Sequence, residues 1–336
     1  MTPSPELSLD QAGVLAATPP SADIAPGDAG LTTAKGTFSS LVETTKPGIT
    51  RLVTITSMVG FVMGAVTGNW TVGELLTTGL ICLIGTAMSA AGANAVNQWM
   101  ERDRDAIMPR TRRRPLPQGR VTPGAVLATG VALCVAGVGL LLLAGPIPSL
   151  ISLACVVSYV AVYTPMKTRT TLATFVGAIP GALPPLIGWS AANRSEGFST
   201  LMDAGGLSLF AIMFIWQIPH FMAIAWMYKD DYKAGGYMVL PVVDEKGVWT
   251  ALTVALWTLA LIPASLFPIK AMPELLGLPY GIVAGAAVLV FGALAMRLIV
   301  SRTRSAARAV FFASIAHLPL VLLAMTVEAV VRTLAR

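Results

Sequence analysis

Two carboxylates and an amide recur at four-residue intervals near the end of one long apolar run. Asn97, Glu101 and Asp105 stand at positions i, i+4 and i+8. On a helix they would fall within roughly 80° of arc, with Asn94 inside the same arc. Mg²⁺ prefers oxygen ligands, takes one or two carboxylates, and completes its shell with water and substrate phosphates. The stripe therefore predicts a cradle for a hard divalent cation.

A dense group of arginines follows this stripe. Residues 101–120 contain seven Arg against three acids. Arginine binds phosphate oxygens through two parallel hydrogen bonds, so carboxylates, a divalent cation and arginines together suit a diphosphate. The alternative is an ordinary basic loop at a membrane surface, in which the few acids are solvated.

Two further segments carry charged residues after apolar runs. Asp230 and Asp231 follow the sixth run. Adjacent positions on a helix diverge by about 100°, so we expect only one of them to face the first stripe. The alternative is that both are simply solvated at a helix end. Lys167 and Arg169 follow the fourth run, just after Tyr163, and we expect them on the same side of the membrane.

The chain has only two histidines, His220 and His317, and both lie within apolar stretches. Ionisable residues inside a membrane are candidates for function by default. A hydrogen bond between helices is the alternative for each. Because no second ligand stands at a suitable spacing, the sequence assigns neither histidine to a metal site.

The elements that must position these residues are membrane-spanning helices. The chain is 55% hydrophobic and only 12% charged, with a mean hydropathy of +0.72, whereas soluble domains are about 25% charged. This composition excludes a soluble globular enzyme and a disordered protein, and its continuous apolar runs exclude an outer-membrane barrel. Nine runs approach the roughly 20 residues that a bilayer requires. They cover residues 49–68, 75–97, 124–144, 147–164, 172–192, 205–226, 249–268, 278–299 and 309–331. The prediction is an all-α polytopic membrane protein with nine transmembrane helices.

The charges also predict domain limits and orientation. Residues 1–34 hold four acids, no Lys or Arg, and many Pro, Ala, Ser and Gly, so we predict a disordered cytoplasmic tail at 1–44 and one transmembrane domain at 45–336. Nineteen of the 23 Lys and Arg residues fall on one side of the predicted spans. The positive-inside rule then places the N-terminus in the cytoplasm and the C-terminus outside. The tail resembles neither a secretory signal nor a transit peptide, which favours the cytoplasmic (inner) membrane of a bacterium.

Proline and glycine are unusually dense in the fifth run. Between residues 177 and 188 stand three glycines and three prolines. We expect kinks there, and the backbone groups that a kink releases must be met by neighbours or by water. That requirement suits the wall of a cavity.

Taken together, these segments resemble the intramembrane aromatic prenyltransferase superfamily over about residues 45–335, and in detail its haem-directed branch. The residues that carry the resemblance are Asn97-Gln98 with Glu101 and Asp105, Met108 to Thr111, Arg114 to Leu116, Tyr163 to Pro165, Gly181 to Pro185, Gly188-Trp189, Pro219 to Phe221, Asp230 to Tyr232 and Ala234-Gly235. The chain departs from the general superfamily pattern at two points, and both variations resemble the haem branch. Glu101 replaces an Asp in the first motif, and the second motif lacks a regular Asp-x-x-x-Asp spacing.

The resemblance implies nine helices around a central, lipid-accessible cavity. It implies transfer of a farnesyl group from farnesyl diphosphate to a vinyl group of haem b with addition of water, giving haem o and diphosphate. Mg²⁺ or another divalent cation would be the cofactor, and haem b a substrate. The implied partners are farnesyl diphosphate, haem b, the lipid bilayer and haem A synthase, with no nucleic acid.

The site residues that we expect form two sets. The catalytic and metal-ligating set is Asn97, Glu101, Asp105, Asp230 and Asp231, with His220 as a further catalytic residue. The substrate-binding set is Asn94, Arg110, Arg114, Tyr163, Lys167 and Arg169. For His220 three roles stay open: a contact to the haem iron, a contact to a propionate, or action as a base.

Two other functions compete with this expectation. The first is a sister prenyltransferase that acts on a quinone precursor or another aromatic acceptor. The second is a transporter or channel, which would place charges along a pore at mid-membrane depth. The carboxylates of this chain instead gather at one predicted membrane boundary.

Overall fold

The computed structural model describes residues 34–336, and every regular element in that range is helical. In chain order the elements are α1 (Ala34–Thr44), α2 (Pro47–Ala65), α3 (Val72–Ile107), α4 (Pro123–Leu141), α5 (Pro146–Val157), the π-helical η1 (Ser158–Tyr163), α6 (Thr164–Met166), α7 (Ala173–Ala182), α8 (Pro184–Ala192), the 3-10 segment η2 (Arg194–Leu201), α9 (Ala204–Met227), α10 (Lys229–Ala234), α11 (Leu240–Val243), α12 (Val248–Ala271), α13 (Leu278–Ser301) and α14 (Arg304–Leu334). Within the described range nine helical segments are long and apolar enough to cross a membrane, which confirms the all-α, nine-span prediction.

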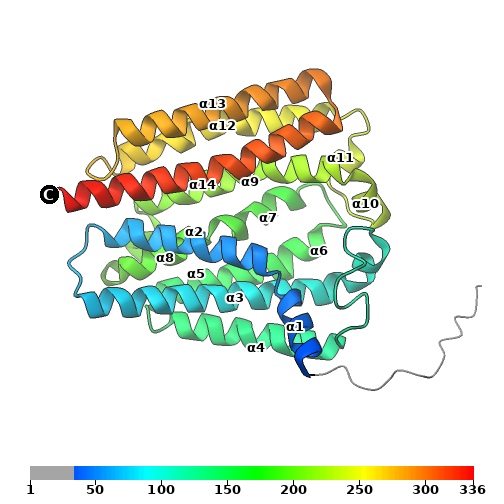
Figure 1. Ribbon diagram of the computed structural model, residues 1–336, viewed down its shortest axis with the longest axis horizontal. Helices are drawn as coiled ribbons and strands as arrows, with labels where there is room; N and C mark the ends of the chain where they lie inside the picture. The colour runs from blue at the N-terminus through cyan, green and yellow to red at the C-terminus, as the bar shows by residue number, and fades with distance from the viewer. Residues whose placement is uncertain (1–33) are drawn as a thin grey trace, which may run out of the picture.

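The helices run side by side along one common direction (Figure 1). On one side α13 packs against α12 and α14, and both of these pack against α9. On the other side α3 packs against α4 and α2, and α2 packs against α8. The short elements α1, α6, α10 and α11 gather at one end of the bundle, and the C-terminus lies at the opposite end.

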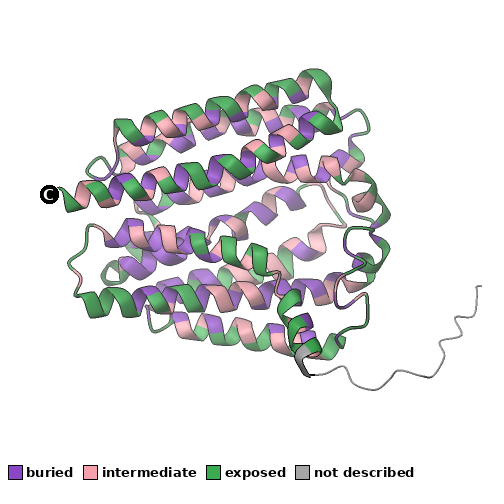
Figure 2. Ribbon diagram, in the orientation of Figure 1, coloured by how far each residue is buried: buried purple, intermediate pink, exposed green. Residues whose placement is uncertain are grey.

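The outer surface of the bundle is apolar, which is the reverse of a soluble protein. Exposed residues cover the outward faces of α12, α13 and α4 (Figure 2). They include Leu256, Leu259 and Leu289, each more than 60% exposed. Such a large exposed apolar surface is stable when it contacts lipid, because the hydrocarbon tails of the bilayer are themselves apolar.

The first described helix corrects part of the predicted tail. Residues 34–44, which we expected to be disordered, form α1, while residues 1–33 lie outside the described range. The helix is fixed by tertiary contacts that local composition does not reveal. Thr44 is fully buried, its carbonyl accepts a hydrogen bond from Gln98 Nε2 at 2.9 Å, and Leu41 packs against a small apolar cluster around Ala95.

The fifth span is broken where its prolines predicted a kink. Helix α7 ends at Ala182 and α8 begins at Pro184, with Leu183 between them. Beyond the break, α8 lies against α2 at backbone contact. A Cβ atom on Gly188 would overlap the backbone of Ser57, and one on Gly60 would overlap that of Pro185. Small residues that bring backbones together are a common basis of helix packing in membranes.

We therefore expect Gly188→Ala to lower the free energy of unfolding by about 1–3 kcal/mol, the usual cost of overpacking. Thermal unfolding of the purified protein in detergent measures the effect. Gly285→Ala on α13 is the matched control, because a Cβ atom there meets no atom within 4 Å. Equal melting temperatures for the two variants would contradict the contact between α2 and α8.

Candidate active site

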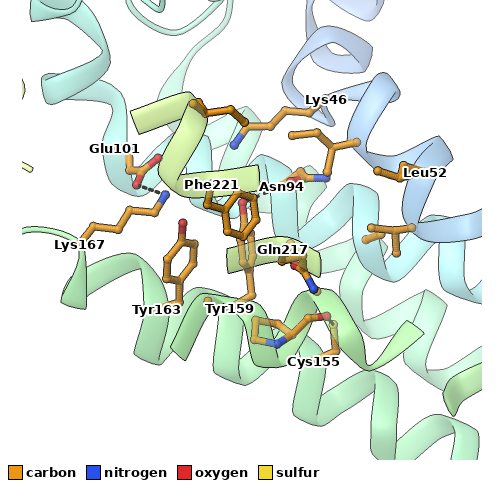
Figure 3. A pocket seen from close by; sticks show the side chains of 18 of the residues that line it. Lys46, Leu52, Asn94, Glu101, Cys155, Tyr159, Tyr163, Lys167, Gln217 and Phe221 are labelled. Atoms are coloured by element: carbon orange, nitrogen blue, oxygen red, sulfur yellow. Dashed lines mark hydrogen bonds and ion pairs between the residues drawn. The ribbon is translucent and has the colours of Figure 1, made fainter. Parts of the chain in front are cut away.

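A cavity of about 410 Å³ lies between α9 and the group formed by α2, α3, α5 and α7. Along α3 its lining extends from Thr86 to Asp105, roughly 28 Å at 1.5 Å per residue. The stretch near Thr86 is walled mainly by apolar and hydroxyl side chains, and the stretch near Asp105 by charged ones. Figure 3 shows the ion pair at the charged end and Gln217 and Cys155 farther along. The shape suits a long apolar molecule with one anionic end.

The two predicted carboxylates line the charged end of this cavity. Helix α3 continues unbroken to Ile107, so Glu101 and Asp105 lie on one face, as the spacing predicted. Both residues are buried, with exposed fractions of 6% and 1%. Glu101 Oε1 pairs with Lys167 Nζ at 2.8 Å (Figure 3). Asp105 Oδ2 pairs with Arg114 Nη1 at 2.6 Å.

The two asparagines of the stripe have different positions. Asn97 is buried but does not line the cavity. Its Oδ1 accepts a hydrogen bond from Lys46 Nζ at 2.6 Å, and its Nδ2 donates to Thr164 Oγ1 at 3.0 Å. Asn94 lines the cavity, and its Oδ1 accepts a hydrogen bond from Tyr159 at 3.4 Å.

Cations at the charged end outnumber its acids. Lys46, Lys167, Arg110 and Arg114 all line it, against the two carboxylates of α3. Loss of water lowers the pKa of Lys46 to about 7, and the nearby Arg114 acts in the same direction. Burial also opposes the charge on Lys167, but the Glu101 carboxylate outweighs it and holds the pKa of Lys167 well above its ordinary value. The excess of positive charge favours an anionic ligand.

Lys46 is a site residue that the sequence analysis missed. It lies directly before Pro47, the first residue of α2, and has a left-handed backbone, with φ 49°. Such a backbone is uncommon outside glycine, and it persists where surrounding contacts determine it. The available signal was a lysine directly before a proline at a predicted membrane boundary.

The second acidic motif, Asp230 and Asp231, lies near the first but outside the cavity lining. Asp231 Oδ2 accepts a hydrogen bond from the backbone N–H of Arg110 at 3.3 Å, which joins α10 to the segment after α3. Asp230 is exposed. Neither aspartate lines the cavity. The Arg110 guanidinium stacks 5.1 Å from the Tyr228 ring and 5.4 Å from the Tyr232 ring.

Tyrosines form part of the wall between the charged and apolar ends. Tyr159, Tyr163, Tyr232 and Tyr237 line the cavity, and only Tyr163 was predicted. Lys167 Nζ lies 4.5 Å from the centre of the Tyr163 ring. The electron-rich face of such a ring attracts a cation that has lost its water.

Of the two histidines and Arg169, only His220 lines the cavity. His220 lines the cavity, whereas His317 does not; His317 packs 5.7 Å from the Phe291 ring. Arg169 is exposed and does not contribute to the lining. Near the charged end, Met238 N–H donates to Lys167 O at 2.8 Å, and Gly235 lies beside the Met108 side chain.

The donor set at the charged end fits a hard divalent cation. Asp105 is buried and lines the cavity, and within residues 34–336 its Oδ1 atom has no hydrogen-bond partner. A buried carboxylate oxygen without a partner is costly unless a ligand completes it. Glu101 stands one helical turn away on the same face. Oxygen donors of this kind are those that Mg²⁺ takes in proteins.

Known proteins resemble this chain in both sequence and fold. A profile of the UbiA prenyltransferase family matches residues 50–317. A protoheme IX farnesyltransferase of Opitutus terrae is 41% identical over 296 residues, which cover 87% of this chain and 95% of that protein. One from Solibacter usitatus is 42% identical, covering 83% of this chain and 95% of that protein.

Solved structures share the fold at lower identity. A digeranylgeranylglyceryl phosphate synthase superposes with a TM-score of 0.71 at 16% identity, covering 88% of this chain and 99% of that one. A UbiA homologue from Archaeoglobus fulgidus, bound to GPP and Mg²⁺, superposes with a TM-score of 0.60 at 14% identity, covering 85% of this chain and 99% of that one.

Proposed function

The chain belongs to the UbiA prenyltransferase family, and from this premise we propose that it transfers the farnesyl group of farnesyl diphosphate to a vinyl group of haem b. Water is added in the same reaction, and the products are haem o and diphosphate. The observation that carries the proposal is the cavity itself, which joins a cationic end to a long apolar interior in a chain 41% identical to a protoheme IX farnesyltransferase.

The cationic end is proposed to bind the diphosphate. Lys167 and Arg114 line the cavity and are already held in place by the two carboxylates. Arg110 lies at the same end and is oriented by two tyrosine rings. Arginine contacts to phosphate oxygens are short and often paired, so this group can fix the orientation of the diphosphate as well as attract it.

Glu101 and Asp105 are proposed to hold the divalent cation, with Asp231 as a candidate from the opposite motif. Asn97 and Asp230 were predicted with them; the Asn97 oxygen already accepts a bond from Lys46, and Asp230 is exposed. A bound Mg²⁺ supplies positive charge that stabilises the diphosphate as it leaves. The arginines and lysines contribute to the same end from the protein side.

The apolar part of the cavity is proposed to hold the farnesyl chain and the porphyrin. The carbon–oxygen bond to diphosphate breaks, and the terminal vinyl carbon of haem b bonds to the allylic carbon. The positive charge then lies on the vinyl carbon next to the porphyrin, where water adds and loses a proton. Apolar residues that line the cavity, such as Met213, Trp216 and Ile224, keep water away from the allylic cation until the new carbon–carbon bond has formed.

A direct assay tests this function. Membranes containing the protein are given labelled farnesyl diphosphate together with haem b and 4-hydroxybenzoate, and extracted pigments are separated by chromatography. We expect label in the hydroxyethylfarnesyl haem and none in the benzoate. Transfer to the benzoate alone would assign the chain to a quinone-precursor enzyme instead.

The location is proposed to be the cytoplasmic membrane of a bacterium, with the cationic end of the cavity on the cytoplasmic side. The asymmetry of Lys and Arg supports this orientation. We expect alkaline phosphatase fused after Arg336 to be active and a fluorescent protein fused there to be dark. A dark phosphatase fusion with a bright fluorescent fusion would place the C-terminus in the cytoplasm instead.

An association with haem A synthase stays a prediction from the family resemblance.

A further inference from the structure

The imidazole of His220 is held on three sides within the membrane. Its ring stacks on Trp216 at 4.7 Å between centroids and 18° between planes. It also stacks on Phe311 of α14, at 5.3 Å and 24°. Its Nδ1 atom is 2.7 Å from Ser314 Oγ. Contacts on both faces and at Nδ1 hold the ring in one orientation. Proteins orient metal-binding histidines in the same way, with one ring nitrogen hydrogen-bonded and the other left for the ligand.

Ser314 determines which nitrogen carries the proton. Its hydroxyl hydrogen is used in a bond of 2.6 Å to the Phe311 carbonyl. With its hydrogen on that carbonyl, the same oxygen accepts from His220, and the tautomer that satisfies both contacts carries the hydrogen on Nδ1 and leaves Nε2 with a bare lone pair. The Ser314 carbonyl also accepts a bond from Trp216 Nε1 at 2.8 Å. One residue of α14 thus fixes both the histidine and the ring stacked on it.

His220 belongs to the cavity wall, and its second ring nitrogen is Nε2. Within residues 34–336 its Nε2 atom has no hydrogen-bond partner, and it is not enclosed by protein, whereas both ring nitrogens of His317 are enclosed. His220 lies eight residues before Tyr228, the residue that caps α9 and stacks with Arg110, so it is roughly 12 Å deeper than the cationic end. It is therefore set apart from the diphosphate.

On the basis of the proposed function, we propose that Ser314 is a positioning residue that presents His220 Nε2 to the cavity as an axial ligand of the iron of haem b. A bare lone pair has no hydrogen to give to a propionate, which excludes that contact. A base would become an imidazolium ion, and Ser314, which is neutral, supplies no negative charge to stabilise it. The iron is a Lewis acid that needs a lone pair and no proton transfer. Iron lies at the centre of the macrocycle, so this depth leaves a vinyl edge free to reach toward the cationic end.

Haem spectroscopy on the purified protein in detergent tests the assignment. Ferrous haem b is added, and the iron–histidine stretching band is measured by resonance Raman. We expect the band in the wild type, its loss in His220→Ala, and its return when imidazole is added to that variant. His317→Leu is the matched control and should keep the band, because the chain has only these two histidines. A band that survives in His220→Ala would overturn the proposal.

The role of Ser314 has its own readout. Ser314→Ala should retain the band at a lower frequency and bind haem about tenfold more weakly, a usual effect of losing the bond behind a metal-bound histidine. Ser314→Thr keeps the hydroxyl and should restore the frequency. Binding of iron-free protoporphyrin should be equal in the wild type and both Ser314 variants. An unshifted band in Ser314→Ala would refute the positioning role.

These results are separable from the proposed function. Haem o formation is measured in parallel on the same wild-type preparation. An iron–histidine band without farnesyl transfer would contradict the proposed function and leave the ligand assignment standing. Farnesyl transfer with no iron–histidine band in the wild type would contradict the ligand assignment and leave the proposed function standing.

Discussion

Asp105→Asn is expected to lower kcat for haem o formation by about 10²–10³-fold, the range seen when one group that stabilises leaving-group charge is removed. Asp105 is 1% exposed, lines the cavity, and has one carboxylate oxygen without a partner in the described residues. An amide of the same size keeps the shape but removes the charge that a divalent cation needs. Steady-state kinetics with farnesyl diphosphate, over a range of Mg²⁺ concentrations, measure the loss.

Asp103→Asn is the matched control for this experiment. Asp103 stands two residues away on the same helix, and its side chain is 86% exposed. The same chemical change there should leave kcat within about twofold, because an exposed charge interacts weakly. If the two variants were equally active, Asp105 would have no part in binding the cation. Haem binding by both variants shows that the cavity remains intact.

Lys167→Met is the second change with a large expected effect. It leaves the Glu101 carboxylate buried without its partner, and breaking such a pair costs about 3–5 kcal/mol. It also removes a cation from the proposed diphosphate site. We expect a lower melting temperature together with a higher KM for farnesyl diphosphate. Thermal unfolding and kinetics on the same preparation measure the two effects.

A double variant separates stability from binding. In Glu101→Gln with Lys167→Met, the unpaired charge is gone, so the melting temperature should recover most of the loss. Activity should not recover, because both the cation and a candidate metal ligand are missing. Recovery of activity with stability would mean that the pair serves only to hold the fold.

The helical stripe was predictable from sequence because its residues are close along the chain. Glu101 and Asp105 needed only the 3.6-residue period and a helix that continued past the predicted span. The nine spans were predictable for a similar reason, since length and hydropathy are local properties. The interruption at Leu183 was predictable because proline lacks the backbone N–H that continues a helix, and two prolines follow Leu183 directly.

The rest of the site depends on contacts between distant segments. Lys46 meets Asn97 across 51 positions, and Ser314 meets His220 across 94. No local pattern marks a serine in an apolar helix as the partner of a particular histidine. Asp231 shows the same limit, because its motif indicated an acid near the site but not that it would accept a backbone hydrogen bond from Arg110. The helix of residues 34–44 was missed because burial of Thr44, rather than composition, holds it.

The residues that line the cavity all come from the first two thirds or so of the chain, so the evolutionary constraints on the C-terminal part are different. Among the described residues its wall ends at Tyr237, so α12 and α13 contribute nothing to it, and α14 acts only through Ser314 and Phe311 behind His220. Substitutions in the last hundred residues are therefore constrained mainly by packing and by lipid. A library of apolar exchanges on the outer faces of α12 and α13 should retain activity far more often than one spread over α3 and α9. The outer faces of α12 and α13 are the part of this enzyme most open to redesign and to adaptation to a different membrane.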